Sequence, residues 1–131
     1  MRKTVLVVDD EPDVVAYLCA LLRDNGYETL EAFNGDQALE IARHQKPDLV
    51  TLDITMPEMT GVKAYRTFRE DEALKRIPVV IVTGVTHDFK HFISTRAHVP
   101  PPDGYLEKPI QPNELLAEVR KHIGGVPATL A

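Results

Sequence analysis

Acidic residues stand directly after two apolar segments of this sequence. Asp9 and Asp10 follow the apolar run at 5–8, and Asp53 closes the segment at 48–53. Short apolar runs rich in β-branched residues are typical of strands that are buried on both faces. Neighbouring strands of a parallel sheet end at the same edge, so these carboxylates are expected to converge there.

Crowded carboxylates repel one another unless a proton or a cation neutralises them. Oxygen ligands favour magnesium or calcium, and magnesium tolerates a site of one or two carboxylates that retains several waters. Two further apolar segments end near Thr83 and Lys108, a hydroxyl and an ammonium that we expect at the same edge. A cation, an ammonium and a hydroxyl around a carboxylate are what a transferred phosphoryl group requires.

The elements that must position these groups alternate along the chain. Apolar, extended segments are followed by amphipathic patterns with helix-terminating residues, which predicts an α/β fold: a doubly wound, five-stranded parallel sheet of order 2-1-3-4-5 with five helices. The second strand is the most polar and suits a sheet edge. Strands are expected at 5–8, 28–33, 48–53, 77–83 and 104–108, and helices at 12–25, 35–45, 61–72, 86–97 and 112–123.

The composition limits the function classes. The chain has 131 residues, enough for one domain, which we place at 1–124, with 125–131 as a tail or truncated linker. A net charge of -5 argues against direct nucleic-acid binding, and the apolar runs predict neither a membrane span nor a signal peptide, hence a cytoplasmic protein. The single cysteine, Cys19, is expected to be buried and inert.

Four motifs together resemble a known family. They are "VDDEP", "DLVTLDITMPEMTG", "VVIVTG" and "YLEKP", and their order and spacing resemble the receiver domain of two-component response regulators over residues 3 to about 123. The resemblance implies a flavodoxin-like fold and a phosphorylation-dependent signalling switch. It further implies that Asp53 accepts a phosphoryl group from a histidine of a sensor kinase or phosphotransfer protein.

The resemblance also implies a role for each residue of the site. Mg²⁺ would be bound by the side chains of Asp10 and Asp53, by Asp9 through water and by the backbone carbonyl of Thr55. Lys108 would pair with the phosphoryl group or with Asp53, and a cis peptide is expected between Lys108 and Pro109. Thr83 would rotate to bond the phosphoryl group, and Tyr105 would be the aromatic residue whose rotamer follows Thr83.

Some features depart from the family pattern. Gly84 stands where alanine is usual, and "VPPPDG" at 99–104 lengthens the connection between Thr83 and Lys108. We hypothesise that this proline segment reshapes the partner surface; the alternative is a passive insertion. His87, His91 and His98 share one side of the expected fourth helix, where a solvated polar face is favoured over a metal site.

Two other functions are open to this sequence. One is a degenerate receiver that acts as a binding module without phosphorylation, although no acid or lysine of the motif is missing. The other is a small phosphohydrolase with an aspartate nucleophile, whose motif needs a second acid where this chain has Thr55. The leading interpretation is a switch that is not an enzyme beyond Mg²⁺-dependent self-phosphorylation and slow self-dephosphorylation, with an unknown downstream partner and possible homodimerisation.

Overall fold

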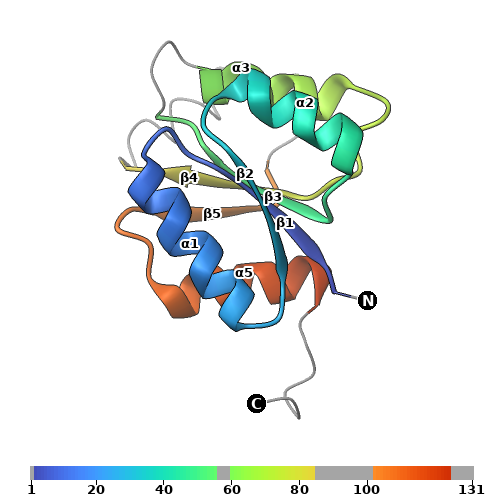
Figure 1. Ribbon diagram of the computed structural model, residues 1–131. Coiled ribbons are helices and arrows are strands. Elements are labelled where there is room, and N and C mark those ends of the chain that lie inside the picture. Colours follow the sequence, from blue (N-terminus) through green and yellow to red (C-terminus); the bar gives the residue numbers. More distant parts are fainter. Residues whose placement is uncertain (1, 56–59, 85–101, 125–131) are drawn as a thin grey trace.

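Five parallel strands form the centre of the molecule (Figure 1). The computed structural model describes residues 2–55, 60–84 and 102–124. The strand order is β2-β1-β3-β4-β5, so the predicted topology is confirmed. The strands span Thr4–Val8 (β1), Glu28–Ala32 (β2), Leu49–Asp53 (β3), Val79–Thr83 (β4) and Gly104–Glu107 (β5).

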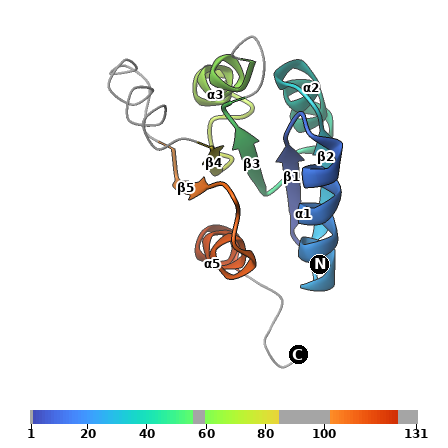
Figure 2. The same cartoon turned by 90° about the vertical axis from the view of Figure 1, so that its left-hand side faces the viewer.

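Helices cover both faces of the sheet, with α2 and α3 on one face and α1 and α5 on the other (Figures 1 and 2). They span Pro12–Asp24 (α1), Gly35–Gln45 (α2), Thr60–Glu70 (α3) and Pro112–Ile123 (α5). The helix expected at 86–97, its three histidines and most of the proline segment lie outside the described residues. Within the described ranges, no helix has the length and apolarity that crossing a bilayer requires.

Local chemistry starts the helices soon after the strands end. Pro12 and Pro112 occupy the first helical position of α1 and α5, where a missing N–H costs nothing. At α2 the Asn34 side chain accepts a hydrogen bond from the Gln37 amide at 2.8 Å, and the Gln37 side chain accepts one from the Phe33 amide at 2.8 Å. This reciprocal cap keeps the connections short at the carboxyl edge of the sheet.

Alternating side chains of the strands build a separate apolar core on each face. Val5 and Val7 of β1 pack in the core beneath α1 and α5, whereas Leu6 and Val8 pack in the core beneath α2 and α3. Cys19 of α1 belongs to the first of these cores and is fully buried, as predicted. Burial raises the pKa of the Cys19 thiol, which keeps it protonated and unreactive.

An ion pair ties α3 to the start of β4 and β5. One carboxylate oxygen of Asp103 accepts hydrogen bonds from the Arg69 guanidinium at 2.7 Å and from the Val79 amide at 2.8 Å. The Arg69 side chain is only 9% exposed, and its guanidinium lies 5.3 Å from the centroid of the Tyr65 ring. Asp103, which directly precedes β5, is thereby held against α3 and the first residue of β4.

Replacing Asp103 with Ala is expected to lower the free energy of unfolding by about 2 kcal/mol, because it leaves a largely buried guanidinium and an amide without their acceptor. Asp103→Asn retains an acceptor for the Val79 amide, and its free energy of unfolding is expected to fall by about half as much. Urea denaturation of both variants measures the difference. A loss of less than about 0.5 kcal/mol for Asp103→Ala would contradict the assigned role.

Lys46 ends α2 in the left-handed region, with φ 48° and ψ 67°. A side chain in this region costs energy that glycine avoids, so Lys46→Gly is expected to raise the free energy of unfolding by about 0.5–1 kcal/mol. The matched control is Lys63→Gly, at an exposed position inside α3, which is expected to lower it by about 1 kcal/mol. Thermal denaturation of the pair tests the opposite signs, and equal losses would contradict the prediction.

Candidate functional site

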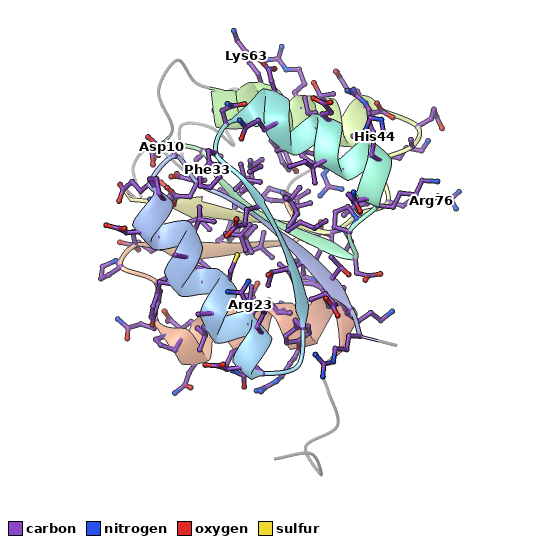
Figure 3. The ribbon with its side chains drawn as sticks, viewed as in Figure 1. Asp10, Arg23, Phe33, His44, Lys63 and Arg76 are labelled. Carbon is purple, nitrogen blue, oxygen red and sulfur yellow. The ribbon has the colours of Figure 1, made fainter. Side chains whose placement is uncertain are left out.

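Three carboxylates meet at the carboxyl edge of β1 and β3. The two strands pair directly, with Val8 opposite Leu52, so Asp9 and Asp53 lie next to each other. One oxygen from each of Asp9, Asp10 and Asp53 lies within 4.8 Å of the others. Asp9 and Asp53 are 2% and 1% exposed, whereas Asp10 is exposed and stands at the surface in Figure 3. The predicted convergence of the acids is therefore observed.

Lys108 bridges the two buried carboxylates. Its ammonium lies 2.9 Å from Asp9 Oδ2 and 3.0 Å from Asp53 Oδ2. The Lys108 amide donates to the Thr83 carbonyl at 2.9 Å, which anchors the residue beside the end of β4. The peptide bond between Lys108 and Pro109 is cis, as predicted.

Burial and the hydrogen bonds of this cluster shift two pKa values. Burial raises the pKa of Asp9, and the Glu11 amide and the Lys108 ammonium offset only part of that effect. Burial opposes the charged form of Lys108, yet its hydrogen bonds to Asp9 and Asp53 raise its pKa overall. The ammonium therefore stays charged at neutral pH and supplies positive charge to the site.

Both buried carboxylates also accept a hydrogen bond from the amide two residues later. Asp9 Oδ1 accepts from the Glu11 amide at 2.9 Å, and Asp53 Oδ1 accepts from the Thr55 amide at 2.8 Å. Such turns orient a carboxylate toward its own loop. The Thr55 hydroxyl donates a second hydrogen bond to Asp53 Oδ1 at 2.6 Å, a contact that was not predicted from the sequence.

Gly61 forms the wall behind Asp53. A Cβ atom at this position would overlap the Asp53 carbonyl oxygen and lie 2.7 Å from the Ile54 Cα. Only glycine lets α3 start this close to the end of β3. Gly61 was not among the residues predicted for the site, although a glycine at the start of a helical pattern is a signal for close backbone approach.

The remaining predicted residues, Thr83 and Tyr105, lie on β4 and β5. Thr83 ends β4 and is 4% exposed, one residue beyond the pairing of Val82 with Asp53. Tyr105 lies on β5 and is 45% exposed, opposite Ile81 of β4. The structure thus brings Asp9, Asp10, Asp53, Thr55 and Lys108 together at one edge, with Thr83 next to them and Tyr105 further along the sheet.

The donor set fits a hard divalent cation. All three clustered side chains offer carboxylate oxygens, and the exposure of Asp10 leaves room for water ligands on the solvent side. The single ammonium of Lys108 does not balance three carboxylates, so a cation would lower the repulsion that remains.

A family model described as the response regulator receiver domain matches residues 5–120. The chain belongs to this family. Receiver domains are phosphorylation-dependent switches of two-component signalling. The DNA-binding response regulator MtrA of Mycolicibacterium smegmatis is 36% identical to this one over 94% of the chain, and the chain spans about half, 51%, of that protein. Protein PilH of Pseudomonas aeruginosa is 34% identical, and the match covers 92% of this chain and 98% of PilH.

Solved structures agree with this membership. The chemotaxis response regulator CheY4 of Vibrio cholerae superposes with a TM-score of 0.81 and 28% identity, over 94% of this chain and all of CheY4. A sensor protein from Polaromonas superposes with a TM-score of 0.84, and at 24% identity this likeness concerns the fold alone. The receiver-domain fold predicted from the motifs is confirmed.

Replacing Gly61 with Ala is expected to lower the free energy of unfolding by about 2 kcal/mol, because the added methyl group must displace the backbone of Asp53 and Ile54. The matched control is Gly84→Ala, where a Cβ atom would meet nothing within 4 Å. Urea denaturation of the two variants measures the difference in the free energy of unfolding. Equal behaviour of the two variants would contradict the role of Gly61.

Proposed function

We propose that Asp53 accepts the phosphoryl group and that its donor is a phosphohistidine of a sensor kinase or phosphotransfer protein. The observation that supports this most directly is the Lys108 ammonium, 3.0 Å from Asp53 Oδ2 and 2.9 Å from Asp9 Oδ2. A buried carboxylate with a cation beside it suits attack on an anionic phosphorus centre. The ammonium can turn from the carboxylates to the incoming phosphoryl oxygens.

In the proposed reaction Asp53 Oδ2 forms a bond to phosphorus while the bond between phosphorus and the donor imidazole nitrogen breaks. The electron pair of the broken bond returns to the imidazole. Lys108 balances the charge on the phosphoryl oxygens as the new bond forms. A Mg²⁺ ion bound by Asp10, Asp53, the Thr55 carbonyl and, through water, Asp9 would neutralise further phosphoryl charge.

The signal would leave the site through β4 and β5. Phosphorylation adds about -1.5 to -2 charges, enough to reorganise nearby hydrogen bonds. We assign the first response to the Thr83 hydroxyl, which lies at the end of β4, and the second to Tyr105, whose side chain is 45% exposed. The proline segment that precedes β5 remains our candidate for a partner surface particular to this chain.

An apolar groove beside Lys108 offers a docking surface for the donor protein. The groove has a volume of about 550 Å³, and Lys108 belongs to its lining, so a protein seated there would meet the rim of the phosphorylation site. We infer that the donor histidine reaches Asp53 from this side. The groove is also lined by Asp13, Val14, Tyr17, Leu18, Pro109 and Ile110.

Several finer features belong to the same proposal. We infer that the domain needs Mg²⁺ for phosphorylation, loses its phosphoryl group slowly, carries no other enzymatic activity and works in the cytoplasm. We assign no output domain. The relatives include MtrA, which is named as DNA-binding, and also PilH, of which the match covers 98%. The proposal gives no part in the reaction to residues 125–131 or to self-association.

Replacing Asp53 with Asn is expected to abolish labelling by a small phosphodonor and to weaken Mg²⁺ binding, because the nucleophile and one metal ligand are lost. The melting temperature in metal-free buffer should stay the same or rise, since one of several crowded charges is gone. Intact-mass measurement, Mg²⁺ titration and thermal denaturation test the three expectations.

Titration with Mg²⁺ and beryllofluoride, followed by a phosphodonor, separates the competing functions. Saturable binding at Asp53 with single-turnover phosphate release supports the switch. Failure of the wild-type chain to bind beryllofluoride indicates a binding module, and multiple turnovers indicate a phosphohydrolase. Labelling of the Asp53→Asn variant would show that another residue accepts the phosphoryl group.

A further inference from the structure

A glutamate and a histidine of α5 meet above the first residue of β5. Glu118 Oε1 lies 3.7 Å from His122 Nε2, and the two residues are four positions apart, so they share one side of the helix. Gly104 has no side chain, and the Glu118 carboxylate occupies that space. A Cβ atom at Gly104 would overlap Glu118 Oε1 and lie 3.3 Å from His122 Nε2. The oxygen and the nitrogen therefore face the same point of β5.

The ring nitrogen of His122 is buried without a hydrogen-bond partner. Among the residues that the structure describes, none makes a hydrogen bond to Nε2. The separation of 3.7 Å from Glu118 Oε1 is longer than the range of about 2.7–3.2 Å in which nitrogen and oxygen form a hydrogen bond. A buried polar atom without a partner is unfavourable, which favours a further group that can bind this nitrogen.

The same separation suits two ligands of one metal ion. Zinc lies about 2.0–2.2 Å from imidazole nitrogen and carboxylate oxygen, and tetrahedral coordination places two such atoms about 3.4 Å apart. The side chains of His122 and Glu118 are 15% and 22% exposed, so packing restricts their rotamers while the carboxylate stays open to water on one side. Only a small movement would bring both atoms to an ion.

The end of α5 also favours a cation. His122 lies in the last turn of the helix, where the unpaired carbonyl groups carry partial negative charge. Arg120 and Lys121 stand in the same turn and oppose a cation, but both are exposed, so solvent and salt screen their repulsion.

We propose that Glu118 and His122 bind a transition-metal ion of the zinc class, with water in the remaining coordination positions. Imidazole nitrogen is a ligand for zinc, nickel and copper(II), whereas magnesium prefers oxygen ligands alone. The site lies at the start of β5, at the opposite edge of the sheet from the three carboxylates, and its chemistry requires neither phosphorylation nor Mg²⁺.

A second pair with the same spacing provides a matched control. Glu40 and His44 of α2 are also four positions apart, but both residues are exposed. Exposed side chains lose more rotamer freedom when they bind an ion together, so this pair is a poorer site. Zinc binding is therefore expected to be the same in His44→Ala as in wild type.

Isothermal titration calorimetry of the chain with zinc chloride tests the site. Excess Mg²⁺ is present throughout, so that Asp9, Asp10 and Asp53 contribute little to zinc binding. Replacing either ligand, in His122→Ala or Glu118→Gln, is expected to weaken binding roughly tenfold or more. Zinc is also expected to raise the melting temperature of wild type and not that of these two variants.

Gly104→Ala tests the geometry with both ligands in place. The added methyl group would displace the Glu118 carboxylate from His122, so this variant is also expected to bind zinc more weakly. Melting temperatures in the absence of zinc provide the folding control for every variant. His122→Gln replaces His122→Ala if the alanine variant does not fold.

The outcomes are distinct. Weaker binding in His122→Ala, Glu118→Gln and Gly104→Ala, together with wild-type binding in His44→Ala, supports the site. Zinc bound at other histidines would bind equally to wild type and to His122→Ala, and that result overturns it. Full binding in a folded Gly104→Ala also overturns the assigned geometry. A wild-type chain that binds no zinc leaves Glu118 and His122 as a polar pair of α5 and overturns the proposal.

Discussion

Repulsion among carboxylates at one sheet edge is the constraint on which this molecule depends. Asp9 and Asp53 are buried almost completely, where an unpaired negative charge is expensive. The structure meets this cost with one ammonium shared by two carboxylates and with amide donors from the two following loops. The negative charge that remains leaves the site receptive to a divalent cation.

The sequence was informative wherever a local rule coincided with the tertiary structure. Apolar runs predicted the strands and placed the acids at their ends, because a parallel strand that is buried on both faces consists almost entirely of apolar residues. Boundaries shifted where side chains intervened. β4 begins at Val79 and not at 77, after Pro78, which has no amide to donate. α3 ends at Glu70 and not at 72. The Asp71 side chain, directly after it, accepts a hydrogen bond from the Ala73 amide at 2.7 Å.

Other contacts could not be predicted, because they depend on which rotamer or residue meets another far along the chain. The pairing of Arg69 with Asp103 joins residues 34 positions apart, and nothing local to either marks it. The close approach of Gly61 to Asp53 requires knowing how α3 is seated on β3. The hydrogen bond from the Thr55 hydroxyl could be predicted more readily, since aspartate side chains commonly accept hydrogen bonds from the residue two positions later.

The burial of Cys19 makes the single thiol of the chain a natural probe of local opening. Its side chain lies between α1 and the sheet, so an alkylating reagent can reach it only when α1 lifts away. The rate of alkylation would then report how often Cys19 becomes exposed. Because α1 begins beside the acidic edge, such openings would expose the same region through which a cation or a donor protein arrives.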